Sequence, residues 1–132
     1  FGFTEARLGI APAVISPFAI RKIGISHARA LFTTAERFDA NRALAIGLVH
    51  QVVPAAELDD AVQATLRNIR LSGPAGVRAA KRMAMTVLDL PDAEARDLTA
   101  QTIAGLRVSE EGQEGIRAFL EKRAATWAQT DE

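Results

Sequence analysis

The sequence predicts an α/β chain that is mostly α-helical, with one or two strands near its N-terminal end. Alanine is abundant, Leu, Arg and Glu fill the long segments, and Gly and Pro lie at their borders, a pattern typical of helices. Residues 1–10 read as a strand, and residues 48–53 are the only other stretch with the β-branched density of a strand. Two strands do not form a sheet core, so we expect further strands from another part of the protein.

The composition is that of one globular domain or part of one. The 132 residues are 48% hydrophobic and 24% charged, which argues against disorder and low-complexity repeats. Sixteen Lys and Arg balance sixteen Asp and Glu, so no net charge attracts nucleic acid or an anionic membrane. Cysteine is absent, and no run of about 18 apolar residues occurs. We therefore expect a soluble protein of the cytoplasm without disulfides or thiolate metal sites.

The first residues of the sequence have the pattern of a strand interior. Phe1 to Thr4 reads as the middle of a buried strand, and Gly9 is expected to form the turn that ends it. A strand needs neighbouring backbone to pair with, so this opening predicts that further polypeptide precedes Phe1.

Two helices and a short third one are expected before residue 48. The first runs from Ala13 to Ile23, with Pro17 in its first turn, and Gly24 stops it. Ser26 is a possible cap for the next helix, which runs to Thr33. A short helix then extends from an Asp39 cap to Gly47, whose missing Cβ suits a left-handed C-terminal position.

Four longer helices are expected in the rest of the chain. Apolar residues at spacings of four, four and three make residues 58–69 the clearest amphipathic helix. Pro74 is well placed to start the next helix, and Pro91 ends it near Leu90. The last two helices cover residues 92–107 and 110–123. The residues expected to face inward on the helix after Pro74 are Val77, Ala80, Ala84 and Val87.

Several kinds of chemistry can be set aside from the spacing of residues alone. His27 and His50 are 23 positions apart, and no HExxH or paired-cysteine motif exists, so no metal site is expected. Ser16 does not stand in a GxSxG motif and reads as a local cap. The run from Gly73 to Lys81 lacks the GxxxxGK[ST] spacing of a phosphate loop.

Two groups of basic residues and one acid remain as candidates. Arg78, Lys81 and Arg82 share one helix face, and Lys122 with Arg123 ends the last helix beside Phe119; each group is either a solvated face or a phosphate contact. Glu5 lies beside the predicted buried strand. An apolar setting would favour its protonated form and make it a proton donor, whereas the alternative is an exposed acid paired with Arg7 or another base.

Motifs in a fixed order extend over practically the whole chain. They are Phe1 to Pro12, Arg37 to Ala40, Gly47 to Val49, Val52 to Pro54, Gly73, Pro74, Lys81, Ser109 to Gly115 and Phe119 to Arg123. In this order they resemble the enoyl-CoA hydratase/isomerase (crotonase) family. The resemblance implies the C-terminal half of the ClpP/crotonase-like ββα spiral fold, because a complete crotonase is about twice this long. Residues 1–53 would be part of the spiral core and residues 54–132 a helical oligomerisation region.

The resemblance also implies roles for three residues. Glu5 matches the second glutamate of the hydratase pair, which is usually assigned the proton donor, while Phe119 and Lys122 match the residues at the adenine and phosphate end of coenzyme A. Coenzyme A is part of the substrate, and no other cofactor is implied. The first glutamate and both oxyanion-hole amides would belong to an N-terminal half, expected as a separate polypeptide that packs on Phe1, Phe3 and the first helix, in an assembly of three or six units.

Within the family, residues 11–17 look most like hydratases of methylglutaconyl-CoA or isohexenylglutaconyl-CoA. Ala13, Val14 and Ile15 replace a Gly-rich run of many hydratases, and their added Cβ atoms would reshape the wall of the acyl pocket. The predicted activity is therefore hydration of a branched or glutaconyl-type enoyl-CoA, in fatty acid or branched-chain acid metabolism. Two alternatives stay open: a double-bond isomerase, and a non-catalytic helical assembly subunit or fragment.

Overall fold

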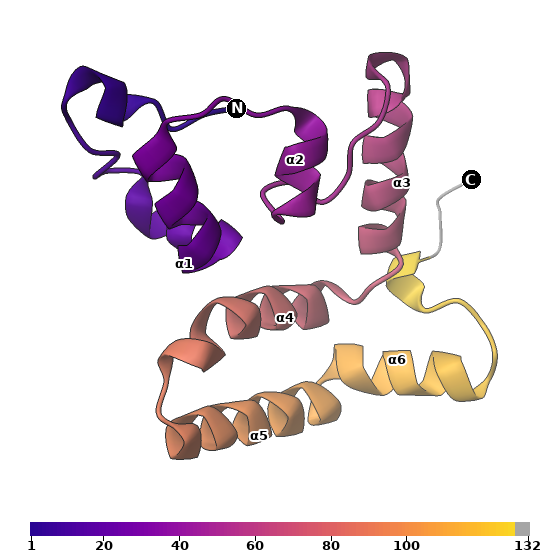
Figure 1. Ribbon diagram of the computed structural model, residues 1–132. Coiled ribbons are helices and arrows are strands. Elements are labelled where there is room, and N and C mark those ends of the chain that lie inside the picture. Colours follow the sequence, from indigo (N-terminus) through magenta and orange to yellow (C-terminus); the bar gives the residue numbers. More distant parts are fainter. Residues whose placement is uncertain (129–132) are drawn as a thin grey trace. The chain divides into compact units, whose positions relative to one another are not determined.

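The computed structural model describes residues 1–128 and forms two compact units (Figure 1). Unit 1 comprises residues 1–57, and unit 2 begins at Leu58. The division after residue 53 into spiral core and oligomerisation region stays a prediction.

Unit 1 consists of short helices. They are the 3₁₀ helix η1 (Glu5–Leu8), α1 (Ser16–Thr34), α2 (Ala40–Ala45) and the 3₁₀ helix η2 (Ala55–Glu57). Gly24 has φ 76° and ψ 159°, so α1 is two helical segments joined at a kink, which confirms the predicted stop. Ser26 makes no capping hydrogen bond, whereas the Asp39 carboxylate accepts from the Arg42 N–H at 2.8 Å and caps α2 as predicted.

Both predicted strands are wrong as extended elements of the described chain. In the first, a single antiparallel bridge joins Gly2 to Arg37, and the chain then turns into η1. The Phe1 and Phe38 backbones exchange two hydrogen bonds, of 2.8 and 3.0 Å. Residues 48–53 contain no strand. The physical reason is that a strand is stabilised by a neighbouring strand, and within residues 1–57 the pairing seen is the one bridge between Gly2 and Arg37.

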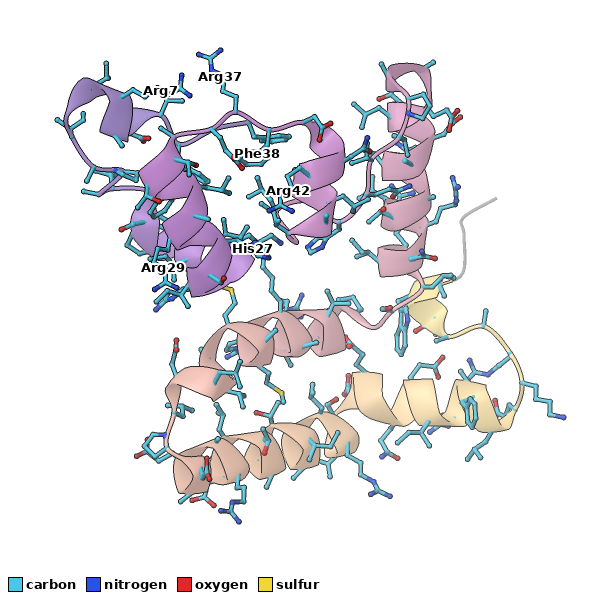
Figure 2. The ribbon with its side chains drawn as sticks, viewed as in Figure 1. Arg7, His27, Arg29, Arg37, Phe38 and Arg42 are labelled. Carbon is cyan, nitrogen blue, oxygen red and sulfur yellow. The ribbon has the colours of Figure 1, made fainter. Side chains whose placement is uncertain are left out.

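A small apolar core holds unit 1 together. Phe38 lies between α1 and α2 and brings its ring against those of Phe1 and Phe3, with centroid separations of 5.7 and 6.5 Å (Figure 2). The Phe3 ring also meets Phe32 edge-on at 5.0 Å. The buried members of the core are Ile23, Ala28, Leu31 and Ile46. This packing fixes the bridge and therefore the start of η1, where Glu5 lies.

Unit 2 contains four α-helices and two 3₁₀ helices among its described residues. They are α3 (Leu58–Arg70), α4 (Pro74–Thr86), the 3₁₀ helix η3 (Val87–Asp89), α5 (Asp92–Val108), α6 (Glu110–Leu120) and the 3₁₀ helix η4 (Thr126–Ala128). The start of α4 at Pro74 and the break at Pro91 are confirmed. After η3 the chain reverses, so α5 runs beside α4, and α6 follows after a sharp turn at Ser109 (Figure 1).

The predicted inward face of α4 is wrong in part. Ala80 and Ala84 are exposed, whereas Ala79 is buried and Met83 is half-buried against α5. Alanine occurs on two opposite sides of this helix, with Ala75 and Ala79 on one and Ala80 and Ala84 on the other. The apolar periodicity therefore did not determine which side faces α5.

Many large apolar side chains are exposed in both units. The stripe of α3 predicted to be apolar is between 37% and 56% exposed. Its residues are Leu58, Val62, Leu66 and Ile69. None of the described helices combines the length and hydropathy that crossing a membrane would require.

Candidate functional site

Glu5 is held at the start of η1 by a tight local turn. The N–H of Gly9 donates to the carbonyl of Ala6 at 3.1 Å, and the N–H of Ile10 donates to the carbonyl of Glu5 at 3.3 Å. Gly9 has φ 74°, a left-handed conformation that glycine adopts at low cost. The predicted turn at Gly9 is thus confirmed, and it fixes the backbone that carries the Glu5 carboxyl group.

The Glu5 side chain has a buried oxygen without a partner. Its Oε2 atom is inaccessible to solvent and forms no hydrogen bond to any described residue. The Arg7 side chain is exposed and points away from the unit, so the alternative of an exposed Glu5 paired with Arg7 is wrong (Figure 2). Buried polar atoms of native proteins are nearly always paired, so this oxygen calls for a partner from outside the described residues. This oxygen is therefore the strongest candidate in unit 1 for contact with a reacting group.

The segment that follows Glu5 presents apolar side chains to its surroundings. Val14 is 89% exposed and Ile15 is 41% exposed, just before α1. The Ser16 hydroxyl donates to the Ala13 carbonyl at 2.9 Å. The prediction of Ser16 as a cap is wrong, because Ile15 occupies the cap position of α1 and no side chain accepts from the free N–H groups of the first turn. These residues are available to form a wall against a ligand or another polypeptide.

The second candidate cluster lies at the end of α6 in unit 2. The Phe119 side chain is 82% exposed, and Lys122 is also exposed. The N–H of Lys122 donates to the Phe119 carbonyl at 3.2 Å, and the N–H of Arg123 donates to the Ala118 carbonyl at 3.0 Å. This pair of bonds is a Schellman motif, in which the residue at the Lys122 position is usually glycine. Lys122 adopts φ 54° there.

Arg123 and Glu114 form a two-pronged ion pair beside this turn. The Arg123 Nη1 and Nη2 atoms donate to the two Glu114 carboxylate oxygens at 2.7 and 2.9 Å. The same carboxylate accepts from the Thr126 N–H at 3.0 Å. These bonds, the one from Arg123 foremost, lower the pKa of Glu114 to about 2, and they raise the pKa of Arg123. Arg123 Nε also donates to Glu121 at 2.7 Å.

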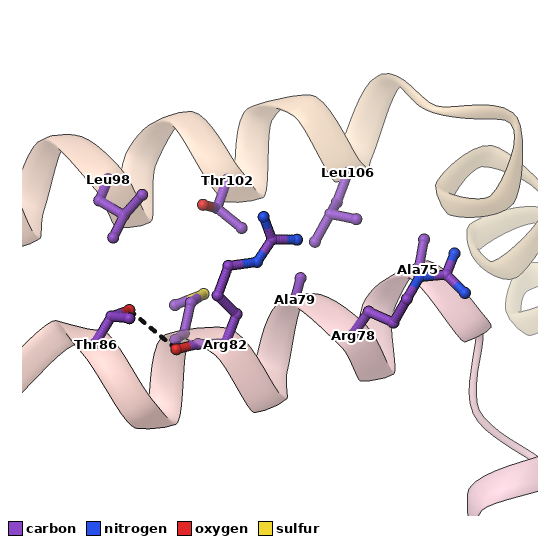
Figure 3. Close-up of a pocket in the computed structure, with 9 residues that line it drawn as sticks. Ala75, Arg78, Ala79, Arg82, Thr86, Leu98, Thr102 and Leu106 are labelled. Carbon is purple, nitrogen blue, oxygen red and sulfur yellow. Dashed lines mark hydrogen bonds between the residues drawn. The ribbon is translucent and has the colours of Figure 1, made fainter.

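A recess of about 240 Å³ lies between α4 and α5 (Figure 3). Arg78 and Arg82 line it, together with Thr86 and Thr102, and the Arg82 guanidinium reaches toward α5. The sequence placed Arg78, Lys81 and Arg82 on one face, but Lys81 does not line this recess. The Thr86 hydroxyl donates to the Arg82 carbonyl at 2.9 Å, which is an ordinary bond within a helix.

The two candidate clusters belong to different units. Glu5 lies in unit 1, and Phe119 and Lys122 lie in unit 2. The sequence did not single out Glu114 or Trp127 for any role. Glu114 pairs with a residue nine positions away across a helix end, and the Trp127 indole N–H donates to the Leu71 carbonyl at 3.3 Å. The one available signal was the position of Glu114 in the quoted motif Ser109 to Gly115.

The histidines lie apart from both clusters. His27 is half-buried, and His50 is exposed with its Nε2 atom 2.9 Å from the Lys22 ammonium group. Within residues 1–128 no three side chains of His, Asp or Glu are grouped so that they could hold a metal ion.

Comparisons with known proteins assign the family. The model of the enoyl-CoA hydratase/isomerase family matches residues 1–130. The chain therefore belongs to the enoyl-CoA hydratase/isomerase (crotonase) family, as its motifs indicated.

Particular relatives carry hydratase or dehydratase names. The chain is 32% identical to a crotonyl-CoA hydratase of Syntrophomonas wolfei, over 96% of this chain and 49% of the relative. It is 31% identical to a carnitinyl-CoA dehydratase of Escherichia coli K12, over 96% of this chain and 51% of the relative. The chain thus spans about half the length of the curated relatives it matches.

Solved structures confirm the fold class. An enoyl-CoA hydratase/isomerase from Marinobacter aquaeolei matches 98% of this chain and 49% of its own, with a TM-score of 0.91 and 36% identity. AtuE of Pseudomonas aeruginosa matches 94% of this chain and 48% of its own, with a TM-score of 0.89 and 38% identity. The chain has the fold of the C-terminal half of a crotonase, and its part of that fold is mostly helical.

Proposed function

We propose that the protein containing this chain is an enoyl-CoA hydratase and that Glu5 delivers the proton to the α carbon. The observation that carries this proposal is the buried Glu5 Oε2 atom, which has no hydrogen-bond partner among the described residues. A carboxyl group in such a setting is available to a reacting atom, and general acids of this kind accelerate proton transfer. The hydratase names of the relatives agree with this activity.

The proposed reaction is the addition of water across a conjugated double bond. A second carboxylate removes a proton from water as the oxygen bonds to the β carbon. The electrons of the double bond move toward the thioester oxygen, where two backbone N–H groups stabilise the negative charge. Glu5 then gives its proton to the α carbon. One proton is removed from water and one is delivered by Glu5, so the reaction conserves protons and electrons and requires no redox or metal cofactor.

The second carboxylate and the N–H groups would come from an N-terminal half. Support comes from the length of the relatives, about twice that of this chain, and from exposed apolar residues in unit 1. Phe1 is 60% exposed and Phe18 is 70% exposed, which is the surface such a half would cover. We propose the active form as an assembly of three or six complete units, in the cytoplasm.

Phe119 and Lys122 are proposed to bind the coenzyme A tail. An exposed aromatic ring offers a stacking surface for adenine, and an ammonium group suits a phosphate. Both side chains are exposed at the end of α6, and the Lys122 ammonium group has no partner among the described residues.

The acyl group is proposed to be branched or of the glutaconyl type. The support is the exposure of Val14 and Ile15 just downstream of Glu5, where many hydratases have a Gly-rich run. Side chains at these positions reduce the space near the thioester and alter the shape of an acyl pocket. Relative kcat/KM values for straight-chain and branched substrates would test this preference.

The activity is tested by Glu5→Gln in the protein assembled with its N-terminal half. Glutamine keeps the shape of the side chain but has no acidic proton. We expect the hydration rate to fall at least about a thousandfold, since positioned acids contribute about 10²–10⁴-fold and the pair acts jointly. Binding of coenzyme A should remain unchanged. Glu36→Gln, which changes an exposed acid of unit 1, serves as the control and should keep full activity.

Analysis of the reaction products distinguishes a hydratase from an isomerase and from a non-catalytic subunit. A hydroxyacyl thioester indicates hydration, and a shifted double bond indicates an isomerase. An assembled protein that binds coenzyme A without turnover indicates a non-catalytic subunit. Full hydration by the Glu5→Gln variant would remove Glu5 from the mechanism.

A further inference from the structure

We propose that Glu114 is a positioning residue, which acts with Arg123 to fix the turn that presents Lys122 to the phosphate groups of coenzyme A. The inference rests on the proposed role of Lys122. It gives a role to Glu114, which would not touch the substrate. It also gives different roles to two neighbouring cations, since Arg123 would hold the turn and Lys122 would bind the phosphate groups.

The starting observation is the backbone of Lys122. It has φ 54°, in the left-handed region that residues with a Cβ rarely adopt. Glycine is the usual residue at this place in a Schellman motif. A lysine stays in this conformation only when its surroundings hold it there, and such positions concentrate where function requires them.

The surroundings hold Lys122 from both sides. On the N-terminal side, the Phe119 and Ala118 carbonyls accept the N–H groups of Lys122 and Arg123. On the C-terminal side, the Glu114 carboxylate binds the Arg123 guanidinium at two points and also the Thr126 N–H. Glu114 thus connects the body of α6 to the segment that returns along it.

Trp127 anchors the returning segment further. Its indole N–H bonds to the Leu71 carbonyl, and its ring lies where a Cβ on Gly115 would come within 3.1 Å of it. Gly115 is the neighbour of Glu114, so the ring and the carboxylate hold the same stretch of chain against α6. The turn containing Lys122 is therefore held by contacts on both its N-terminal and its C-terminal side.

The two cations of the turn have different surroundings. The Arg123 guanidinium is engaged by two carboxylates, those of Glu114 and Glu121. Lys122 is exposed and makes no ion pair or hydrogen bond through its side chain with any described residue. The Arg123 guanidinium is therefore occupied by contacts within the turn, whereas the Lys122 ammonium group is available to bind an anionic ligand.

The test is a double-mutant cycle on coenzyme A affinity, measured by calorimetry on the protein assembled with its N-terminal half. We expect Lys122→Gln to weaken binding about tenfold and Glu114→Gln to weaken it several-fold. The double variant should bind no more weakly than Lys122→Gln alone, because Glu114 acts through Lys122. Glu110→Gln is the matched control, one helical turn earlier and exposed, and should bind like the wild type.

Hydrogen exchange at the Thr126 amide gives a readout independent of the ligand. Exchange should be faster in Glu114→Gln and unchanged in Lys122→Gln. If Glu114→Gln does not fold, Arg123→Lys enters the same cycle, because it keeps a positive charge but loses the two-point contact. We expect the same loss of affinity from it.

Two results would overturn the positioning role alone. One is normal coenzyme A binding by Glu114→Gln despite faster exchange at Thr126. The other is a double variant weakened by the product of the two single effects. Normal binding by Lys122→Gln would instead overturn the proposed phosphate contact, and the positioning role with it.

Discussion

The Glu111 carboxylate accepts hydrogen bonds from the Ala75 backbone N–H, at 2.8 and 2.9 Å to its two oxygens, across 36 positions of sequence. It also accepts from the Gly76 N–H at 3.0 Å. The contact connects the start of α6 to the first turn of α4, where unpaired N–H groups and the helix dipole favour a negative charge. A Cβ on Gly73 would lie within 2.5 Å of the same carboxylate, so glycine leaves it room. The motif at Gly73 and Pro74 and the motif Ser109 to Gly115 therefore come together at this contact.

Replacing Glu111 by glutamine should destabilise unit 2. Glutamine keeps one acceptor but loses the charge and the second acceptor, which should lower the free energy of unfolding by about 1–2 kcal/mol. Urea denaturation followed by circular dichroism measures it. Glu110→Gln, at the exposed neighbouring position, should change stability by less than about 0.5 kcal/mol. Equal effects of the two variants would show that the capping contact adds nothing to stability.

Two glycines of unit 2 should respond to alanine in opposite directions. A Cβ on Gly112 would collide with the Leu106 carbonyl oxygen, so Gly112→Ala forces the turn between α5 and α6 to shift. We expect a loss of at least about 2 kcal/mol. Gly105 has open space around it inside α5, and Gly105→Ala should gain about 0.5–1 kcal/mol. Thermal melting of the two variants should therefore move to opposite sides of the wild type.

The ion pair of Glu114 with Arg123 should persist into acid. The pKa of Glu114 is lowered from 4.5 to about 2, chiefly by the hydrogen bond from Arg123, so the folded chain binds a proton here less readily than the unfolded chain. The stabilisation is complete above pH 4.5 and is lost as the pH falls toward 2. The Thr126 amide chemical shift should titrate with a midpoint near 2. Glu114→Gln should remove this titration, and a midpoint near 4.5 would contradict the pairing.

Local sequence signals predicted the helices well. Asp39, Gly24 and Pro74 act within a few residues of themselves, through capping, a positive φ and a fixed φ, so their effects are visible in the sequence. The strand predictions failed because pairing depends on backbone from distant segments, which a local pattern does not specify. Glu5 was found from its motif, but the isolation of its buried oxygen is a property of the folded unit.

The partners of Glu111 and Glu114 were not predictable for the same reason. The Glu111 carboxylate binds the backbone N–H groups of Ala75 and Gly76, and every residue other than proline carries such a group, so no side-chain pattern identifies these partners. Glu114 binds the Arg123 guanidinium and the Thr126 N–H across the turn that ends α6, and the helical spacing of side chains does not apply across that turn. Both acids lie in the motif Ser109 to Gly115, which supported the family resemblance but gave neither acid a role.

The most direct test of the central claim follows the proton at the α carbon. The assembled protein would hydrate an enoyl-CoA substrate in deuterium oxide, and mass spectrometry would measure the rate at which deuterium appears at the α carbon of the product. We expect rapid incorporation by the wild type and a rate at least about a thousandfold lower for Glu5→Gln. Incorporation at the wild-type rate in that variant would contradict the assignment of Glu5 as the proton donor.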